Sequence, residues 1–504
     1  MNEKKRIYSN LYLPLYSFIT LALAVLVYFL MPVFTDFKGG YAYPSGPYWD
    51  ENYHIASAQK YLTGVFFMEP HPPLGKLFIA LGELIINPNK NIDKSSFSTT
   101  DYVSNFPEGF SFAGVRFFPV LFAVFSALLF FLILTRLSVS LHYALAFTAL
   151  FLFDNAMLVH MRAAMLEGIQ IFFILAATLH FLFIIKKESG IKALDYFLLG
   201  TLAGAALSVK LNSAVILILF LFLAYEDFGP LNKLPVLSWK NILHLAKKAS
   251  LSAAGLLIVF FTVFYIHFAV ASRVENGRIY MASKDYQSIL NSGQTADPLN
   301  FFIMLRDYFG YMQNYEKGVP KWDPSKLDEN GSPAFSWPFG YKSINYRWSK
   351  YGSRIAYLYL QANPLIWLTG LLGIITALVF AGGVLLFKAP AGDRREFRII
   401  VYFTLLYCLY MAAMLTIERV MYLYHYFIPL IFSLILAFMI FQYFFRNDMR
   451  SGNTALRNIS IIFFTEIICV FIFFSPLSYF IPIDSLDFIK RAWLPLWSLV
   501  PVNF

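Results

Sequence analysis

Long apolar runs separated by short polar segments dominate the chain. Nine runs carry few charges and approach the length of about 20 residues that a helix needs to cross the roughly 30 Å hydrocarbon core of a bilayer. They are residues 11–34, 117–135, 137–153, 168–185, 251–271, 365–387, 399–417, 420–445 and 459–477. This pattern predicts an all-α polytopic membrane protein.

The region Tyr196–Tyr225 contains two shorter apolar halves divided by Lys210. If the halves are two separate spans, the basic residues of the short connecting segments all fall on one side of the membrane, as the positive-inside rule requires. Those residues are Lys4, Lys5, Arg6, Arg136, Lys186, Lys187, Lys192, Lys233, Lys240, Lys247, Lys248, Lys388, Arg394, Arg395, Arg398, Arg446, Arg450 and Arg457. We therefore predict eleven spans, with the N-terminus cytoplasmic and the C-terminus outside. Gly200 and Gly204 are predicted to serve close helix packing.

This topology leaves two long segments on the outer face, residues 35–116 and residues 272–358, within one membrane-embedded domain over 1–504. Leu74–Ile86 is apolar but too short to cross, so it is predicted to be an interfacial helix. The first run follows a basic tail, MNEKKR, and has no convincing cleavage site for a signal peptidase, so it is predicted to be a retained anchor. Glu466, alone in the last run, is predicted to face the helix bundle.

Composition agrees with a membrane protein, because 58% of the residues are hydrophobic and 14% are charged. Soluble globular proteins carry roughly 25% charged residues, so a water-soluble enzyme, a disordered chain and a disulfide scaffold are excluded. The net charge of +10 would suggest nucleic acid in a soluble protein. Here most of the excess follows the positive-inside pattern, and no nucleic-acid partner is expected.

Two carboxylates, Asp50 and Glu51, follow shortly after the first span. A carboxylate in an interfacial setting has its pKa raised toward neutrality, which makes it a better general base. The alternative is structural, because Asp is also common as the N-cap of a helix. The dipeptide alone leaves both interpretations open.

Further along the same segment, the motif HPPLGK places Lys76 within a turn of the start of the interfacial helix. Its ammonium group is predicted to lie at the level of the lipid headgroups, where a lipid phosphate would be. A lysine there can also simply extend its charged end toward water.

With these motifs the sequence resembles the protein O-mannosyltransferases, a family of the membrane-embedded GT-C fold. The resemblance rests on the DE pair, HPPLGK, FAGVRFFP around Arg116, DNAMLVHMRAAMLE ending at Glu167, LSVKLN around Lys210, SPAFSWPF, NPLIW and ERVMYLYHYFIPL. These blocks follow one another in the order of the family and cover most of the chain. The segment 272–358 is too short for the β-trefoil MIR domain of eukaryotic members, which points to a prokaryotic member.

The resemblance implies an inverting enzyme that moves mannose from a dolichyl or polyprenyl phosphate carrier to Ser or Thr hydroxyls of proteins. It implies Asp50 as the base and Glu51 as a residue that orients the acceptor or the sugar. Fixed cations near the departing phosphate would stabilise the transition state. Five cations at matched motif positions are predicted for this role, Lys76 and Arg419 first, then Arg116, Arg162 and Lys210.

Seven further residues are predicted to contact the sugar or the acceptor. They are His71, Tyr53, His54, Trp337, Tyr424, His425 and Glu167. The family usually has a histidine and a phenylalanine after the acidic pair, in the pattern DE-x-H-F, whereas this chain has Tyr53 and His54 at those two places. Glu167 stands where the family has an Asp. Trp337, with Tyr341, Tyr346 and Trp348, predicts either an aromatic lid or platform or a set of interface anchors.

No HExxH or similar spacing predicts a tightly held metal, and a loosely bound Mg²⁺ or Mn²⁺ is left open. The expected partners are a polyprenyl-phosphate-mannose donor, a secreted or membrane protein acceptor and membrane lipids, and homo-oligomerisation is left open. The expected location is the cell membrane, with the active site on the outer face.

Three alternatives compete with this interpretation. The first is a transferase of the same fold that moves another sugar to lipid A or another lipid or glycan acceptor. The second is a polytopic transporter, which would concentrate its charges in broken helices at mid-membrane and often shows internal repeats. The third is an inactive member of the family.

Overall fold

The computed structural model describes residues 3–31, 46–187, 190–229, 239–326 and 329–502. The chain divides into two compact units. Unit 1 contains Met1–Tyr43, Val124–His160 and Pro320–Phe504, and unit 2 contains Pro44–Ala123 and Met161–Val319. Two helices, α6 (Ala113–Leu137) and α8 (Asn155–Met161), contribute residues to both units.

Unit 1 consists mainly of long apolar helices. They are α1 (Glu3–Val25) with its π-helical continuation η1 (Leu26–Leu30), α7 (Leu141–Leu152), α15 (Pro364–Phe387), α16 (Arg394–Leu415), α17 (Phe427–Ser451) and α18 (Thr454–Ser478). Helix α15 packs closely on α17. A Cβ atom added at Gly373 would lie 2.7 Å from the backbone nitrogen of Ala437, so there is no room for a side chain there. The short helices η5 (Ala334–Phe339) and η6 (Leu423–Tyr426) lie before α15 and α17 in the sequence.

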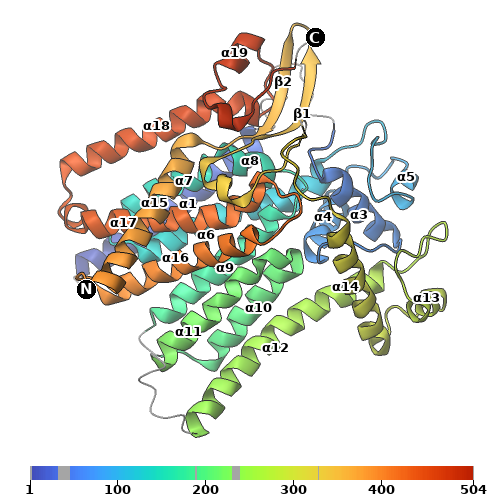
Figure 1. The fold of residues 1–504 in the computed structure, drawn as a ribbon, viewed down its shortest axis with the longest axis horizontal. Helices are drawn as coiled ribbons and strands as arrows, with labels where there is room; N and C mark the ends of the chain where they lie inside the picture. Colours follow the sequence, from blue (N-terminus) through green and yellow to red (C-terminus); the bar gives the residue numbers. More distant parts are fainter. Residues whose placement is uncertain (1–2, 32–45, 188–189, 230–238, 327–328, 503–504) are drawn as a thin grey trace. The chain divides into compact units, whose positions relative to one another are not determined.

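The described residues also form a two-stranded antiparallel hairpin, β1 (Ile344–Tyr351) and β2 (Arg354–Leu360), which was not predicted from the sequence. Gly352 forms its turn with a positive φ of 59°, a conformation that glycine adopts without strain. The hairpin lies beyond the end of α18, beside α19 (Ser485–Ile489) (Figure 1). Tyr357 of β2 packs against Phe488 of α19, with ring centroids 4.5 Å apart.

Unit 2 contains both short helices and longer apolar helices. Its helices are α3 (Glu51–Thr63), α4 (Leu74–Ile86), α5 (Ser95–Ser98), α9 (Glu167–Ile185), α10 (Ala193–Val209), η2 (Leu211–Leu217), α11 (Ile218–Phe228), α12 (Trp239–Val270), α13 (Lys284–Asn291), η4 (Pro298–Asn300) and α14 (Phe301–Gly318). The predicted interfacial helix is present as α4 over the predicted residues.

Close packing of α10 against α12 requires glycine at two positions of α10 (Figure 1). A Cβ atom at Gly200 would lie 2.2 Å from the carbonyl oxygen of Ser252, and one at Gly204 would lie 2.5 Å from that of Leu256. Because any side chain would collide with backbone at both positions, the predicted packing role of this pair is confirmed.

Within the described residues, nine helices are long and apolar enough to cross a membrane, and α7 with α8, bent by 64°, makes a tenth. The break at Lys210 is present, because α10 ends there and η2 begins at the next residue. Helix α10 has 17 residues and is shorter than the others. The polytopic all-α architecture is confirmed, while the number of spans by length and composition is nine or ten. Residues 32–34 of the first run and 35–45 of the first outer segment lie outside the described residues.

The prediction for Glu466 is wrong. Its side chain is exposed on α18, a helix whose apolar stretch is only 22% buried by the rest of the protein. The sequence position of an acid within an apolar run does not fix its direction, because direction depends on which face of the helix the neighbouring helices cover.

Candidate active site

A tight turn over residues 48–51 places Asp50 at the start of α3. The backbone N–H of Glu51 donates to the carbonyl of Tyr48 at 2.9 Å, and Trp49 between them has a positive φ of 44°. Asp50 precedes the helix, but its side chain makes no capping hydrogen bond to the first turn. The side chain of Asp50 is half-buried. The simple capping role is therefore not what the structure shows for this carboxylate.

Unlike Asp50, Glu51 has a fully buried side chain, and its carboxylate accepts hydrogen bonds that hold the surrounding segments together. Arg116 donates to both of its carboxylate oxygens, from Nε at 2.7 Å and from Nη2 at 2.6 Å. The backbone N–H groups of Tyr48 and Ala164 donate to it at 2.7 and 2.6 Å. Four donors saturate the carboxylate, and a charge so held fixes the turn that carries Asp50.

Two arginines lie against the ring of Tyr48. The guanidinium carbon of Arg116 is 3.9 Å from the ring centroid, and that of Arg162 is 5.9 Å from it. Both side chains are buried, with exposed fractions of 4% and 2%. Cations over an aromatic face are stabilised electrostatically, so Tyr48 holds two of the predicted phosphate ligands in one place.

Two predicted lysines each form a buried ion pair with a glutamate. Lys76 pairs with Glu69, and Lys210 pairs with Glu167. The alternative interpretation, that Lys76 simply extends its charged end toward water, is not what the structure shows, because only 1% of its surface is exposed. Burial lowers the pKa of Lys76, and the Glu69 carboxylate opposes that shift.

Glu69 is a residue that the sequence interpretation missed. It also accepts a hydrogen bond from the hydroxyl of Ser57 on α3, so it links the HPPLGK segment to the helix that begins after Asp50. An acid between an apolar FFM and the prolines of PHPP was the available signal.

His71 lies beside both lysines. Loss of solvation, with the Lys210 and Lys76 ammonium groups, holds the pKa of His71 well below its usual range. The hydroxyl of Tyr308 on α14 donates to the backbone carbonyl of His71 at 3.1 Å. A neutral imidazole is therefore fixed among charged groups, where it can donate or accept a hydrogen bond without adding charge.

The residues after the acidic pair differ in exposure. His54 is buried on α3, and its charge is close enough to influence His71. Tyr53 is 41% exposed, and its ring contacts that of Tyr102 edge-on at 4.8 Å. Of these two, Tyr53 is the more accessible to an incoming molecule.

A second cluster of charged residues, in which only Lys60 is fully buried, joins the two predicted outer segments. Lys60 of α3 pairs with Asp101, and Asp101 also accepts from Arg278 at 2.7 Å and from the hydroxyl of Tyr280 at 2.6 Å. Residues 278 and 280 come from the segment after α12. Burial lowers the pKa of Lys60, and the Asp101 carboxylate opposes that shift.

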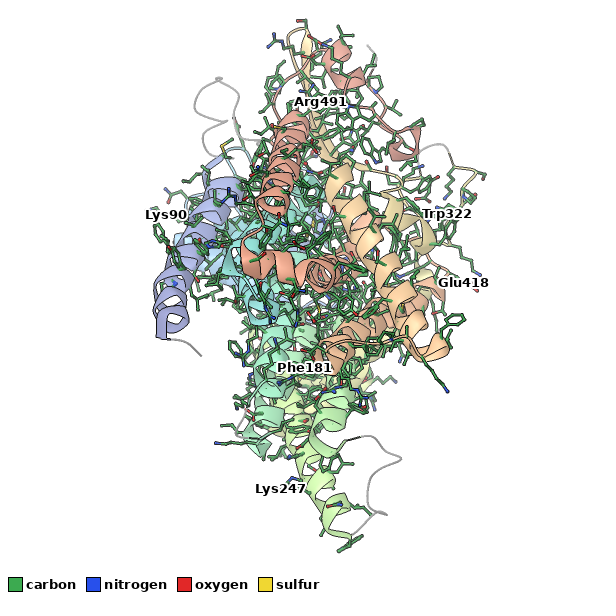
Figure 2. The ribbon with its side chains drawn as sticks, turned by 90° about the vertical axis from the view of Figure 1, so that its left-hand side faces the viewer. Lys90, Phe181, Lys247, Trp322, Glu418 and Arg491 are labelled. Carbon is green, nitrogen blue, oxygen red and sulfur yellow. The ribbon has the colours of Figure 1, made fainter. Side chains whose placement is uncertain are left out.

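The remaining predicted site residues belong to unit 1. Arg419 is half-buried in the connection after α16, where residues 418–420 pair with residues 320–322. Glu418 and Trp322 lie side by side in this pairing (Figure 2). The backbone N–H of Val420 donates to the carbonyl of Pro320 at 2.9 Å, which fixes the path of the chain through Arg419.

Trp337, His425, Tyr424 and His160 form an aromatic stack. The successive ring centroids are 6.0, 4.6 and 4.6 Å apart, with interplanar angles of 15°, 22° and 22°. Trp337 is fully buried, and its indole N–H donates to the backbone carbonyl and the hydroxyl of Ser332. Trp337 and Trp348 therefore differ, since Trp348 is 44% exposed, and the predicted aromatic set is not one continuous face.

Unit 2 thus holds ten of the fourteen predicted site residues: Asp50, Glu51, Tyr53, His54, His71, Lys76, Arg116, Arg162, Glu167 and Lys210. Unit 1 holds Trp337, Arg419, Tyr424 and His425. Within the described part of the chain, no three His, Cys, Asp or Glu side chains gather in a way that would hold a metal ion.

Family models identify the relationship of this chain to known proteins. Residues 26–272 match the model of dolichyl-phosphate-mannose-protein mannosyltransferase, and residues 310–497 match the model of the C-terminal four-transmembrane region of protein-O-mannosyltransferase. Together the two models cover most of the chain, including both sets of site residues.

Individual relatives agree with the family models. The chain is 28% identical over 257 residues to Protein O-mannosyl-transferase 1 of Danio rerio, a match that covers 50% of this chain and 35% of that protein. It is 30% identical over 176 residues to Dolichyl-phosphate-mannose--protein mannosyltransferase 1 of Candida albicans, covering 35% of this chain and 18% of that protein. The matches thus span about a third or less of the length of these relatives.

Among solved structures, the fold is similar to a protein O-mannosyltransferase from the Pmt1–Pmt2 complex of S. cerevisiae. The TM-score is 0.72, with 16% sequence identity, and the similarity covers 94% of this chain and 92% of that chain. This confirms the predicted GT-C architecture, and with the two family models it shows that the chain belongs to the protein O-mannosyltransferase family.

Proposed function

We propose that this protein is an inverting mannosyltransferase that moves mannose from a polyprenyl phosphate carrier of the dolichyl type to Ser or Thr hydroxyls of proteins. The observation that carries this proposal is the contrast within the acidic pair. Asp50 is half-buried at the edge of a rigid turn, while Glu51 beside it is saturated by Arg116 and two backbone donors. Family membership supports the donor and the acceptor.

The chemistry requires a base for the acceptor. In the proposed step, Asp50 accepts the proton of the acceptor hydroxyl as the hydroxyl oxygen forms a bond to the anomeric carbon of mannose. The bond from that carbon to the phosphate oxygen breaks, and its electron pair leaves with the lipid phosphate. A single displacement of this kind inverts the anomeric carbon. Proton transfer to a positioned base contributes about 10²–10⁴ in rate.

The leaving phosphate requires positive charge that is fixed before the reaction. Lys76, Lys210, Arg116 and Arg162 are buried in unit 2. The first three are held in position by the carboxylates of Glu69, Glu167 and Glu51, respectively. Cations that need no reorganisation stabilise a developing charge more effectively than mobile ones. We assign Lys76 and Lys210 to the phosphate in unit 2, and Arg419 on the basis of its motif.

The remaining roles complete the proposal. Glu51 acts as a positioning residue that holds the turn of Asp50, and Glu167 and Glu69 hold the lysines. His71 provides a neutral hydrogen-bonding group near the phosphate, and Tyr53 and His54 lie next to the acceptor. Trp337, Tyr424 and His425 contribute an ordered aromatic stack to the sugar or acceptor site.

The enzyme is further proposed to lie in the cell membrane, with its N-terminus cytoplasmic and its site on the outer face. The positive-inside pattern supports that orientation. The acceptor is a secreted or membrane protein, and the short segment 272–358 supports a prokaryotic member without a MIR domain. Association between copies of the chain is compatible with this proposal.

A divalent ion is an optional part of this proposal. If a Mg²⁺ or Mn²⁺ ion is loosely bound, Asp50 would be the residue that holds it, and the ion would supply positive charge to the donor phosphate. Treatment with EDTA, followed by addition of each metal separately, tests this: activity that is lost and then restored by one metal supports the ion, and full activity in EDTA excludes it.

The deciding experiment follows radiolabelled mannose from a short polyprenyl phosphate mannose to a Ser/Thr-rich peptide in the presence of purified protein. We expect labelled peptide from the wild type and none from Asp50→Asn protein with an unchanged melting temperature. Label that reaches a lipid acceptor but no peptide would instead support the transferase of another acceptor. Substrate flux into liposomes without any transfer product would support a transporter.

A further inference from the structure

A cavity of about 650 Å³ opens in unit 1 between the start of α7, the end of α17 and the first half of α18. Its walls include His142 and Tyr143 of α7, Met449 of α17, and Arg457 and Phe464 of α18. Cavities of about 300–1,000 Å³ are the size that ordinary ligand sites have. The proposed transfer reaction uses none of these residues.

The walls change from polar to apolar along α18. Arg457 and Ser460 line the first turns of the helix, and Ile461, Phe464 and Ile468 continue the same wall. Spacings of three and four residues put these side chains on one face of the helix. At 1.5 Å per residue, the wall extends about 16 Å from Arg457 to Ile468. The cavity therefore has a charged end at the end of a span and an apolar end toward the middle of the span.

The cavity lies at the opposite end of the unit-1 helices from Arg419. Arg419 precedes the N-terminal end of α17, whereas Gly452, which lines the cavity, follows its C-terminal end after 25 helical residues. The helix has a kink at Phe445. Its residues 427–444, before the kink, extend about 27 Å, close to the roughly 30 Å thickness of the hydrocarbon core. The cavity is thus at the other membrane boundary from the part of the proposed active site that unit 1 contributes.

The charge at the polar end is available for an anion. Arg457 is exposed and forms no ion pair with any carboxylate of the described residues. The neighbouring Asp448 accepts a hydrogen bond from the side chain of Asn453 at 2.7 Å. His142 is also exposed, and its Nδ1 is hydrogen-bonded to the hydroxyl of Tyr16 on α1 at 2.6 Å, which leaves its other ring nitrogen for a ligand.

The membrane determines what kind of molecule reaches this cavity. Ile461 of the apolar wall is 58% exposed. It lies on α18, a helix whose apolar stretch is only 22% buried by the rest of the protein. We therefore infer that this wall is open to the hydrocarbon of the bilayer. An occupant must match an apolar length of span and a cationic end at the headgroup level.

We propose that this cavity binds one glycerophospholipid with a net negative headgroup. Its phosphate would lie at Arg457, near His142 and Ser460, and one acyl chain would follow Ile461, Phe464 and Ile468. Arginine suits this role because its guanidinium forms two parallel hydrogen bonds to a phosphate.

Two matched pairs of variants test the proposal. Arg457→Gln removes the charge from the cavity, and Arg450→Gln removes an exposed charge in the last turn of α17 that does not line it. Ile461→Trp fills the apolar end, and Ile462→Trp changes a neighbour that is 59% exposed and does not line the cavity. Binding of phosphatidylglycerol and phosphatidylcholine to the purified full chain is measured by native mass spectrometry over a titration.

We expect one phosphatidylglycerol to bind the wild type about fivefold more tightly than phosphatidylcholine, because the choline ammonium group offsets the phosphate charge that Arg457 attracts, whereas phosphatidylglycerol keeps its net negative charge. Arg457→Gln should remove that preference, and Ile461→Trp should weaken both lipids by a similar factor. Both control variants should bind as the wild type does. Equal binding of the two lipids by the wild type, or test variants that bind as their controls do, would overturn the proposal. Neither result bears on mannosyl transfer, because the cavity is at the other end of the helices from Arg419.

Discussion

Unit 2 and unit 1 provide different kinds of side chains for the same proposed reaction. In unit 2, cations and carboxylates are buried together as discrete pairs: Arg116 with Glu51, Lys76 with Glu69, and Lys210 with Glu167. In unit 1, the predicted residues Trp337, His425 and Tyr424 form a stack of rings. The first region is organised by charge and the second by ring packing.

This difference indicates that the two sets of residues have different roles in the proposed reaction. Buried ion pairs hold their members at fixed positions, and breaking one is costly because a charge is left without compensation. Stacked rings are held by dispersion and burial, which tolerate a neutral substrate such as a sugar. In the proposed reaction, the base and the buried lysines that bind the phosphate come from unit 2. Unit 1 contributes Arg419 and the ring stack that is proposed to recognise neutral groups.

The largest expected effects separate the two members of the acidic pair. Asp50→Asn should lower kcat by about 10²–10⁴, because it removes the proposed base, and it should destabilise the fold less than Glu51→Gln, because the half-buried Asp50 makes no capping hydrogen bond to α3. Glu51→Gln should lower the free energy of unfolding by about 3–5 kcal/mol, because Arg116 loses the partner of its buried charge. Mannosyl transfer and thermal unfolding of both variants are measured together. The opposite pattern, with a stable Glu51→Gln protein that cannot react, would reassign the base.

The next largest effect concerns the lysines of unit 2. Lys76→Gln and Lys210→Gln should each lower kcat by about 10²–10³, the usual cost of removing one fixed electrostatic group from a transition state. Lys247→Gln is the control, since Lys247 is exposed on α12 (Figure 2). Transfer rates at saturating donor distinguish them. If Lys76→Gln matched the control, that lysine would have no role with the phosphate.

The aromatic stack of unit 1 is expected to respond in stability. Trp337→Phe leaves the backbone carbonyl and the hydroxyl of Ser332 without their indole donor. The loss should cost about 1–3 kcal/mol of unfolding free energy. Trp348→Phe changes an exposed ring and should have no measurable effect. Denaturant unfolding in detergent compares the two, and equal stability of both variants would show that the stack does not hold unit 1 together.

The smallest expected effect is the pH dependence that His71 contributes. Its pKa in the folded protein is well below the usual value of about 6.5, so below that pH the unfolded state binds the extra proton. The free energy of unfolding should therefore fall as the pH falls from 7 to about 5.5. His71→Gln removes this contribution, so its melting temperature should fall less than that of the wild type over the same range. Parallel decreases would mean that His71 is charged in the folded protein.

Much of this fold followed from one-dimensional patterns. Apolar length predicted the spans, Lys210 marked the break between α10 and η2, and Leu74–Ile86 was correctly separated as a short helix. The hairpin was missed because its strands lie inside a segment where long apolar runs gave no signal. Its alternating residues around Gly352 were the indication that was available.

The residues of the candidate site were chosen from motifs, which do not show how the side chains pair. Glu51 is 65 residues from Arg116 and Glu167 is 43 residues from Lys210, so only the folded chain brings these partners together. Glu69 is close to Lys76 in the sequence and was missed because it lies outside the HPPLGK motif. The two carboxylates of the acidic pair are equal in the sequence, and burial is what distinguishes Glu51 from Asp50. Glu466 was placed wrongly because a helical run does not reveal which of its faces is covered.

The left-handed backbone at Trp49 has a consequence for how activity would be lost through mutation. A bulky residue with a φ of 44° is held there at a cost of about 1–3 kcal/mol. Glycine at this position would adopt the same angle without strain, but it would also let the turn adopt other conformations. We expect Trp49→Gly to lower the melting temperature, because the half-buried indole is lost. It should also make the activation entropy of transfer more unfavourable, because Asp50 would have to be ordered again in each catalytic cycle.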